Sequence, residues 1–475
     1  MNISTLVDAQ GLVNTLLAGV SDFLWTYLLI ALLVVAGLYF TWKTRFVQFR
    51  MVGEMFRLLV DTPPSRSKRH ISSFQAFAVS VATRVGTGNL AGVATAIAIG
   101  GPGAVFWMWV IALVGASTAF VESTLAQLFK RREGASFVGG PAYYILYGLR
   151  KRWMARLFAV LLTVTFGLSY NSIQSNTICH AMNEAFGLGH VAVGAALALL
   201  ALVIVFGGIH RIARVSSVMV PLMAVGYVLL AVVVIGMNVG RVPHVMKLIM
   251  TSAFGLEQFS GGAIGMTILA GVKRGLFSNE AGEGSAPNVA ATAHVSHPVK
   301  QGLIQSLGVF TDTLVVCSCT AFIILLSGVY GDVSLDGIAL TQTALESRVG
   351  ASGKYFVAIA IFFFAFSSII GNYYYGEANV LFMTGKRWVI TAFRVMSAGV
   401  MVMFGAMTSL KLVWNLGDVC MALLTACNLV AILALGKYAF RLLADYRGQK
   451  RRGVKEPTFR ASQFPELGDA LHCWD

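Results

Sequence analysis

The chain has 475 residues, of which 57% are hydrophobic and only 12% are charged, and its formal net charge is +15. Soluble domains are about a quarter charged, so this composition excludes a soluble globular protein, a disordered chain and a disulfide-rich secreted module. Apolar runs such as 28–40 are long and continuous, unlike the short alternating segments of a membrane barrel. The composition therefore predicts an all-α integral membrane protein.

Eleven stretches are apolar and long enough to cross a bilayer, which requires about 20 apolar residues in a helix. In chain order, the predicted spans are 23–41, 73–99, 104–129, 155–182, 191–208, 214–236, 259–293, 301–328, 353–380, 386–407 and 415–440. The first span is an extra, peripheral helix, and the other ten form a core. We expect 1–475 to be one transmembrane domain that ends in a polar tail, 441–475.

The basic residues fall mainly in alternate loops, which indicates the orientation of the chain. Loops 43–70 and 130–156 each contain seven Lys and Arg residues, whereas 1–22 and 100–103 contain none. The positive-inside rule then places the N-terminus outside and the C-terminal tail in the cytoplasm, and an odd number of spans agrees. Nucleic-acid binding would need one basic soluble face. The sequence has none, so no nucleic-acid partner is expected.

Two of the predicted spans contain residues that interrupt a helix within the membrane. Span 73–99 contains Val-Gly-Thr-Gly-Asn at 85–89, and span 259–293 contains Asn-Glu-Ala-Gly-Glu-Gly-Ser-Ala-Pro at 279–287. Gly costs about 1 kcal/mol and Pro about 3 kcal/mol inside a helix. Such stretches are tolerated where the backbone lines a cavity enclosed by protein. The sequence therefore predicts two broken helices.

The two interrupted stretches also resemble each other. Both read G-x-G-polar, followed at the same offset by Val-Ala at 93–94 and at 289–290. They open the first and sixth core helices, which are five spans apart and therefore run in opposite directions. We infer an inverted repeat of 73–236 and 259–440, with a substrate site at the membrane midplane. Close helix packing through small residues is the alternative, but it does not explain the polar residues in both stretches.

The chemistry of such breaks suits an amino acid. A half-helix that begins near Gly88 or Gly284 presents free N–H groups and a positive dipole end, which favour a carboxylate. The half-helix that ends before each break presents free carbonyls. These suit an ammonium group or Na⁺, a hard cation that prefers oxygen ligands.

Two polar pairs on other spans allow two interpretations each. Ser367 and Ser368 either bond to their own helix or complete an oxygen cage with carbonyls of the first broken helix. Asn171 and Gln174 are spaced i,i+3 and share a helix face. They either line the cavity or form hydrogen bonds between helices.

Charged residues inside spans need partners, because a charge at the bilayer centre costs about 2.5–3.5 kcal/mol. Asp312 is the most deeply placed, and we expect it to pair with Lys273 or Arg274. The alternative is proton coupling, in which Asp312, Glu122 or Glu280 titrates during transport.

Residues 86–94, 139–144 and 275–287 closely resemble the alanine or glycine:cation symporter family, which comprises sodium:alanine symporters. The resemblance extends over about residues 20–440, and its N-E-A-G-x-G-S-A-P motif is very specific. It implies a LeuT-type fold: a 5+5 inverted repeat with one extra N-terminal helix. It also implies Na⁺-coupled import of a small neutral amino acid, L- or D-alanine or glycine, by alternating access in the bacterial inner membrane.

The resemblance further implies which residues form the sites. For Na⁺, the ligands would be the backbone carbonyls of Ala82, Val85 and Phe364 and the hydroxyls of Ser367 and Ser368. The substrate would be bound by Thr87, Gly88, Asn89, Asn171, Gln174, Phe277, Ser278 and Asn279. Glu283 departs from the family, in which many members have an apolar residue. Its carboxylate either changes specificity or faces cytoplasmic water.

Other classes of membrane protein fit less well. A channel would need a ring of filter residues, and an enzyme would need a nucleophile with a base or a metal motif such as HExxH. The sequence contains neither, so no catalytic residues are expected. Two alternatives of the same fold stay open: a proton-coupled amino-acid transporter, and a sensor that binds an amino acid without transporting it.

Overall fold

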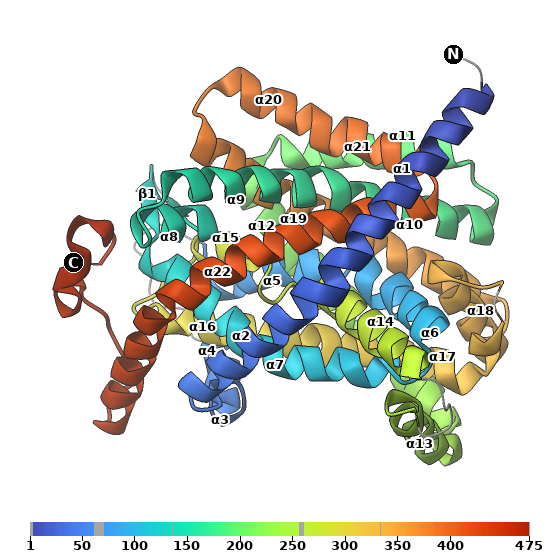
Figure 1. Cartoon of the computed structure of the whole chain (residues 1–475), viewed down its shortest axis with the longest axis horizontal. Helices are drawn as coiled ribbons and strands as arrows, with labels where there is room; N and C mark the ends of the chain where they lie inside the picture. Colours follow the sequence, from blue (N-terminus) through green and yellow to red (C-terminus); the bar gives the residue numbers. More distant parts are fainter. Residues whose placement is uncertain (1–2, 61–70, 135, 256–260, 333, 475) are drawn as a thin grey trace.

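Long helices packed side by side make up the computed structural model of this chain (Figure 1). It describes residues 3–60, 71–134, 136–255, 261–332 and 334–474, and the side chains of these except at 3–10 and 261–263. The first half contains α1 (Ile3–Phe23), η1 (Leu24–Leu29), α2 (Ile30–Lys43), α3 (Val47–Arg50), α4 (Val52–Val60), α5 (Ser73–Arg84), η2 (Gly88–Gly92), α6 (Val93–Gly100), α7 (Ala104–Leu128), β1 (Arg131–Glu133), β2 (Ser136–Val138), α8 (Pro141–Tyr147), α9 (Arg152–Val164), η3 (Thr165–Tyr170), α10 (Asn171–Phe186), α11 (His190–Val205), α12 (Gly208–Met237), η4 (Val239–Arg241) and α13 (Val242–Ala253).

The regular elements among the described residues of the second half are all helices. It contains α14 (Gly261–Asn279), α15 (Ala286–Ala290), α16 (Val299–Val309), η5 (Phe310–Cys317), α17 (Ser318–Ser327), η6 (Val329–Gly331), α18 (Gly337–Val349), α19 (Ser352–Met383), α20 (Arg387–Val395), η7 (Met396–Val400), α21 (Met401–Met407), α22 (Leu410–Arg451), η8 (Ala461–Gln463) and η9 (Pro465–Ala470). Strands β1 and β2 form a small antiparallel hairpin after α7.

Eight helical segments of the described chain are long and apolar enough to cross a membrane. They are Gly11–Lys43, Ala104–Leu128, Arg152–Phe186, Gly208–Met237, Val299–Ser327, Ser352–Met383, Arg387–Met407 and Leu410–Arg451. The prediction of an all-α membrane protein is therefore confirmed. The other three predicted spans, 73–99, 191–208 and 259–293, correspond to two interrupted helices and to the 16-residue α11.

Both predicted helix breaks are present. The first helix stops at Arg84, and the chain becomes helical again only at Gly88. The second stops at Asn279, and α15 begins at Ala286. Between them Gly282 and Gly284 have φ angles of 95° and 81°, a region that glycine enters without steric cost. The glycines of this motif are therefore needed to turn the backbone between the half-helices.

The helices that lie between the predicted spans include α13 and α18 as well as the shorter α4 and α8. α13 occupies part of the predicted loop 237–258, and α18 occupies part of the loop 329–352. α18 packs on the half-helix after the first break, where Thr341 donates a hydrogen bond to the Leu90 carbonyl over 3.0 Å. Tertiary packing explains why α18 is helical, because its sequence has no clear amphipathic periodicity, whereas the sequence of α13 has one.

The C-terminal tail folds back onto the bundle instead of extending into solvent. The Phe459 N–H donates to the Ser296 carbonyl over 3.0 Å. The indole of Trp474, which is only 5% exposed, donates to the Gln127 carbonyl over 3.1 Å. Gln127 in turn donates to the carbonyls of Ala290 and Ala293. The tail is therefore docked beside the segment that follows the second helix break.

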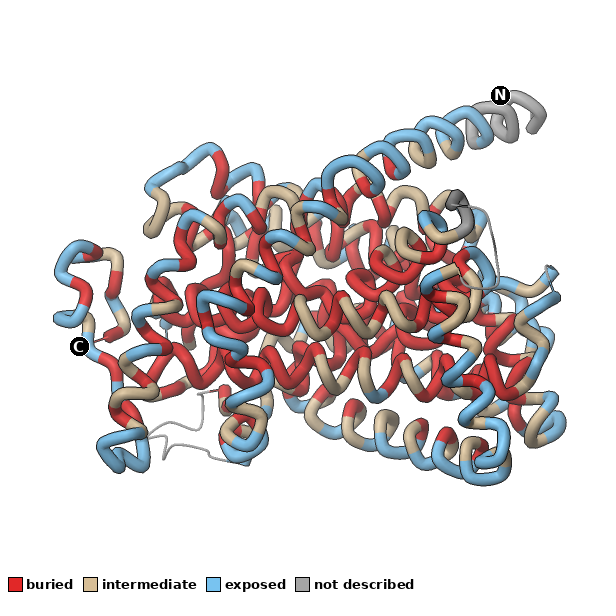
Figure 2. Tube along the Cα trace, turned by 60° about the horizontal axis from the view of Figure 1, so that its bottom comes forward, coloured by how far each residue is buried: buried red, intermediate tan, exposed pale blue. Residues whose placement is uncertain are grey.

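Buried residues form a continuous centre, and exposed ones lie at the periphery (Figure 2). Many exposed side chains on α11 and α12 are large and apolar, such as Leu199 and Leu222, at 65% and 75% exposed. An exposed apolar surface of this extent marks a contact with membrane or protein. α1 and α2 lie along α22 on the outside of the bundle (Figure 1), where an extra peripheral helix was expected.

Candidate functional site

The two helix breaks meet at the centre of the bundle. Gly88, which begins the half-helix after the first break, lies against the end of α14. A Cβ atom at Gly88 would lie 3.0 Å from the Ser278 Cα and 3.2 Å from the Phe277 ring. Contacts below 3.4 Å force the neighbour to move, and here the neighbour is backbone. Glycine is therefore required for the two broken helices to approach this closely.

Asp312 joins the two breaks. Its Oδ1 accepts a hydrogen bond from the Asn89 amide over 2.7 Å, and its Oδ2 accepts one from the Ser278 hydroxyl over 2.8 Å. Asp312 lies on η5, a π-helical insertion in the middle of a long helix, and such insertions occur often at functional sites. The Cys317 Sγ, also on η5, lies 3.3 Å from the Asn89 amide and 3.1 Å from the Ser278 hydroxyl.

The expected pairing of Asp312 with Lys273 or Arg274 is wrong. Both cations instead contact Asp418 on α22, over 2.8 Å and 2.7 Å. The reason is geometric. Lys273 and Arg274 lie one turn or more before Ser278 on α14. At that point along α14, the neighbouring helix α22 presents the Asp418 carboxylate. Asp312 is fully buried and is held by neutral donors at the breaks.

Gln174 holds the first break from the opposite side. Its side-chain oxygen accepts hydrogen bonds from the Thr87 N–H over 3.0 Å and from the Thr87 hydroxyl over 2.7 Å. The Asn89 side-chain oxygen accepts a bond from the Gly86 N–H over 2.9 Å. These side chains satisfy backbone donors that the interrupted helix leaves free. The structure thus brings Thr87, Asn89 and Gln174 together.

Asn171 does not join this group, although it shares a helix with Gln174. Its amide donates to the Ser397 hydroxyl on η7 over 3.0 Å. That contact matches the alternative of a hydrogen bond between helices. The π-helical segment η3 ends at Tyr170, and an i,i+3 spacing does not fix which neighbour each side chain reaches.

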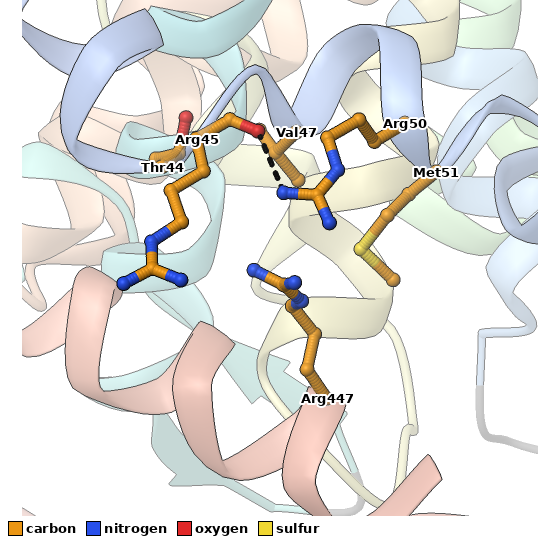
Figure 3. Close-up of a pocket in the computed structure, with 6 residues that line it drawn as sticks. All are labelled: Thr44, Arg45, Val47, Arg50, Met51 and Arg447. Carbon is orange, nitrogen blue, oxygen red and sulfur yellow. Dashed lines mark hydrogen bonds between the residues drawn. The ribbon is translucent and has the colours of Figure 1, made fainter. Parts of the chain in front are cut away.

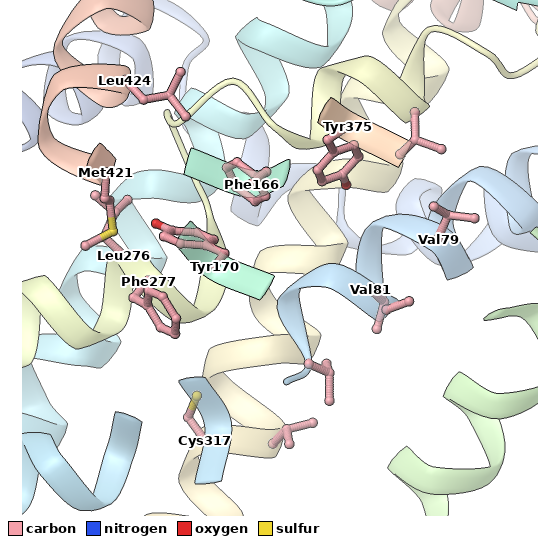
Figure 4. Close-up of a cluster of buried hydrophobic side chains, with 14 of the residues drawn as sticks. Val79, Val81, Phe166, Tyr170, Leu276, Phe277, Cys317, Tyr375, Met421 and Leu424 are labelled. Atoms are coloured by element: carbon pink, nitrogen blue, oxygen red, sulfur yellow. The ribbon is translucent and has the colours of Figure 1, made fainter. Parts of the chain in front are cut away.

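Asn279 and Phe277 close the second break. The Asn279 side-chain oxygen accepts a bond from the Ala281 N–H over 3.0 Å, while its amide nitrogen has no hydrogen-bond partner among the described residues. The Phe277 ring packs between Tyr170 and Trp414, at centroid distances of 4.9 Å and 4.8 Å. Figure 4 shows Phe277 and Tyr170 side by side, near Leu276 and Met421. The result is an aromatic wall beside the paired breaks.

The residues predicted to bind Na⁺ form a cluster of oxygens where α5 ends. The Ser368 hydroxyl contacts the carbonyls of Ala82, Thr83 and Phe364 over 2.9 Å, 3.1 Å and 3.1 Å. The Ser367 hydroxyl contacts the carbonyls of Ala82 and Phe364 over 3.2 Å and 2.8 Å. The fifth predicted ligand, Val85, is the buried residue that follows the last residue of α5, and its carbonyl is not among those that the two hydroxyls contact.

Each serine hydroxyl contacts a carbonyl of its own helix and a carbonyl of α5, so the bond to the own helix is present and the oxygen cage for Na⁺ stays a prediction. Oxygen is the ligand type that hard cations take, and the last carbonyls of a helix lack partners of their own. The cluster thus has the donor set that Na⁺ requires. A Cβ atom at Gly86 would lie only 2.3 Å from the Ser368 hydroxyl, so glycine is needed there too.

Glu280 and Glu122, which the sequence suggested only as alternatives for proton coupling, lie at the second break. Glu280 has a φ angle of 55°, which is rare outside glycine. Its carboxylate accepts bonds from the Ser285 hydroxyl over 2.5 Å and from Thr83 over 3.4 Å. Glu122 accepts bonds from the Gly282 N–H over 3.3 Å and from the Asn428 amide over 2.9 Å. Their burial and partners hold the six-residue break in one conformation.

Glu283 is fully buried and does not face water. Its carboxylate lies 3.3 Å from the Tyr170 hydroxyl, which donates to it. Arg84 is the buried cation beside these groups. It donates to the Gln305 carbonyl over 3.2 Å, and its Nε and Nη2 atoms have no hydrogen-bond partner in the part of the chain described. The solvent-facing alternative for Glu283 is therefore wrong.

Together, the apolar helices, the paired breaks and the oxygen cluster define a membrane transporter. The chain belongs to the sodium:alanine symporter family, whose sequence profile matches residues 10–461. It is thus a sodium-coupled amino-acid symporter with multiple membrane passes.

Its relatives are similar over nearly their whole length. A probable sodium/glutamine symporter, GlnT, of Bacillus subtilis is 50% identical, over 96% of this chain and 94% of the relative. The amino-acid carrier protein AlsT of Bacillus subtilis is 49% identical, over 97% of this chain and 98% of the relative. The sodium/alanine symporter AgcS of Methanococcus maripaludis is 36% identical, over 90% and 95%. The names of these relatives thus include two different substrates.

Proposed function

We propose that the protein imports alanine or glycine together with Na⁺ and binds both at the paired helix breaks. The observation that carries this proposal is the shared hydrogen bonding of Asn89 and Ser278 to Asp312, which joins the two breaks into one site. The amino acid would be bound by seven residues at the two breaks: Thr87, Gly88, Asn89, Gln174, Phe277, Ser278 and Asn279. Asn171 would act indirectly, by fixing η3 and α10 against η7.

The chemistry of the breaks assigns each end of the substrate. The carboxylate would lie at the N-terminus of η2, near Gly88, because a helix N-terminus attracts anions. It would compete there with Asn89 and Gln174, whose side chains accept from the N–H groups of Gly86 and Thr87. The ammonium group would donate to carbonyls at the end of α14. A zwitterion placed in this way spans both broken helices, so its binding depends on how they are arranged.

Na⁺ would be held by the carbonyls of Ala82, Val85 and Phe364 and by the hydroxyls of Ser367 and Ser368. In support, both hydroxyls contact carbonyls of α5 and of their own helix α19. Na⁺ would thus join α5 to α19. The ion would contact the half-helix before the first break, and the amino acid would contact the half-helix that begins at Gly88 after it. Ion and amino acid would thus act on the two sides of one break, and that shared break is the physical basis for coupling.

Alternating access would follow from an inverted repeat of 73–236 and 259–440, in a LeuT-type fold with the N-terminus outside and the C-terminus in the cytoplasm. One Na⁺ entering across about 100 mV gains about 2.3 kcal/mol, and a tenfold gradient adds about 1.4 kcal/mol. Together these support roughly 500-fold accumulation of a zwitterion, since each tenfold step costs about 1.4 kcal/mol.

A small substrate is favoured over glutamine by the packing at the breaks. Gly88 lies against Ser278, and the aromatic wall of Tyr170, Phe277 and Trp414 closes the same region. The test is uptake of radiolabelled alanine into proteoliposomes, with glycine, D-alanine, serine and glutamine as competitors. Strong competition by glycine with little by glutamine supports the proposal. Stronger competition by glutamine than by glycine would contradict it.

Proton coupling is the second candidate, because two relatives are named as sodium/proton-dependent alanine carrier proteins, one of them as a putative one. Buried Glu280 and Glu283 beside the second break are the groups that would titrate. Uptake driven by a pH gradient in the absence of Na⁺, and lost in Glu283→Gln, would favour this candidate. A sensor of the same fold would bind alanine but show no uptake under either gradient.

A further inference from the structure

Five basic residues gather around two adjoining surface pockets at the end of the first candidate span. Lys43 is the last residue of α2, Arg45 lies in the turn that follows, and Arg50 is the last residue of α3. Arg447 and Arg451 lie on α22. Figure 3 shows Arg45, Arg50 and Arg447 around the opening of one pocket, with the guanidinium groups of Arg50 and Arg447 pointing toward each other. We call this group of five residues the arginine pocket.

The turn that carries Arg45 is held in an unusual backbone conformation. Arg45 and Phe46 have φ angles of 54° and 58°, and residues other than glycine rarely adopt such backbone angles. The Phe46 N–H donates to the Thr41 carbonyl over 2.8 Å, and the Gln48 amide donates to the Thr41 hydroxyl over 2.9 Å. This buried network fixes the turn, so the position of Arg45 is built into the fold.

The charge of the arginine pocket is not neutralised by acidic residues that line it. Among the described residues, none that lines either pocket is a carboxylate. Glu54, on the neighbouring α4, is already engaged elsewhere. Its carboxylate accepts from the Tyr446 hydroxyl over 2.5 Å and contacts Arg57 and Lys450 over 2.6 Å and 3.2 Å. The pocket therefore concentrates positive charge at one place on the surface.

The pocket lies where the membrane surface is expected. The candidate spans Gly11–Lys43 and Leu410–Arg451 both end there. Three aromatic side chains beside it are exposed: Trp42 at 68%, Phe46 at 52% and Phe49 at 48%. Exposed aromatic rings with adjacent basic residues are typical of the headgroup region of a bilayer.

We propose that the arginine pocket binds the phosphodiester headgroup of an anionic phospholipid. Guanidinium groups match phosphate oxygens in paired hydrogen bonds, and basic pockets between membrane helices bind anionic headgroups. The exposed rings of Phe46 and Phe49 would contact the acyl chains of the same lipid. The site lies apart from the paired breaks, so it adds a lipid ligand to the proposed symporter without relying on the transport site.

The test is native mass spectrometry of the purified full-length protein, titrated with phosphatidylglycerol and with phosphatidylcholine of the same acyl chains. We expect one tightly retained phosphatidylglycerol that phosphatidylcholine does not replace. In the variant R45Q/R50Q/R447Q, the affinity of the protein for phosphatidylglycerol should fall by about fivefold for each arginine, or roughly 100-fold in total. K386Q/K455Q/R460Q removes the same charge from exposed positions outside the pocket and should bind as the wild type does.

Two further arms keep the result decisive. R45K/R50K/R447K retains the charge and should retain part of the affinity, which separates charge from folding. Inorganic phosphate at millimolar concentration should not displace the lipid, because the acyl chains also bind. Equal retention of phosphatidylcholine by the wild type, equal loss in both glutamine triples, or full displacement by phosphate would each overturn the proposal.

Discussion

Asn89 and Asp312 lie 223 residues apart in sequence, yet the Asn89 amide donates to the Asp312 carboxylate over 2.7 Å. Asn89 belongs to the half-helix after the first break. The same carboxylate accepts a hydrogen bond from the hydroxyl of Ser278, which lies at the end of α14, just before the second break. One acidic side chain thus sets the relative position of both breaks, which is the central structural feature of the proposed transport site.

Asp312→Asn should strongly reduce transport while the protein still folds. The amide keeps the size of the side chain but removes the charge from two hydrogen bonds, and each bond to a charged group contributes about 1.5–3 kcal/mol. Uptake of alanine should fall by at least about tenfold, as expected for a loss of roughly 1.4 kcal/mol. Asp332→Asn changes an exposed residue and is the matched control. Uptake by Asp312→Asn at the wild-type rate would show that transport does not depend on the charge of the Asp312 carboxylate.

Gly88→Ala should abolish uptake. The added methyl group would lie 3.0 Å from the Ser278 Cα, so the first half-helix or α14 must move. Gly226→Ala is the control, because a Cβ atom there has no neighbour within 4 Å. It should leave uptake unchanged and slightly increase stability, since alanine restricts the unfolded chain. The measurement is initial rate at saturating alanine; equal rates for both variants would refute the close approach.

Ser368→Ala should weaken Na⁺ dependence more than alanine binding. Its hydroxyl contacts three carbonyls where α5 and α19 meet, and removing one oxygen ligand should raise the half-saturating Na⁺ concentration by about tenfold, or roughly 1.4 kcal/mol. The alanine KM at saturating Na⁺ should change little. Ser352→Ala, at an exposed position, serves as the control. An unchanged Na⁺ dependence in Ser368→Ala would place the ion elsewhere.

Docking of the C-terminal tail should become stronger as the pH rises above 7. Lys130 lies beneath Trp474 and Phe137, with its Nζ 4.5 Å and 4.2 Å from their rings. Burial lowers the pKa of Lys130 to about 7 from an ordinary value of 10.5. Between pH 7 and pH 10.5, Lys130 therefore binds more protons in the undocked state than in the docked state. The docked state thus becomes more stable as the pH increases through this window. The other titratable groups near Lys130 are Arg132 and Cys473.

Hydrogen exchange of residues 459–474 would measure this docking. Protection should be greater at pH 9 than at pH 6, after correction for the intrinsic exchange rate. Lys130→Met keeps the apolar stem but cannot titrate, so its protection should be independent of pH. The same pH dependence in both proteins would assign the effect to another group.

Local residue preferences were enough to predict the helix breaks. Gly86 and Gly88, and the Gly282–Pro287 stretch, disfavour a helix wherever they occur, so their effect is visible in the sequence. The partners of Asp312 were not predictable, because they depend on the π-helical segment that turns it toward Asn89 and Ser278. Lys273 and Arg274 looked like suitable partners, but α22 supplied Asp418 at their level.

The docked tail and the separation of Asn171 from Gln174 were missed for a similar reason. Trp474 reaches Gln127 across 347 positions of sequence, and no local pattern encodes a contact of that range. Asn171 and Gln174 have the spacing of one helix face, yet one contacts η7 and the other contacts the first break. Periodicity identifies a polar face but does not identify its neighbours.

The most direct test of Na⁺-coupled transport is alanine uptake into proteoliposomes of the purified protein with an inward Na⁺ gradient, against K⁺ at the same pH. Alanine should accumulate only with Na⁺ outside, and the accumulation should collapse when the gradient is abolished. Equal uptake with K⁺, or binding of alanine without any flux, would contradict Na⁺-coupled transport at the paired breaks.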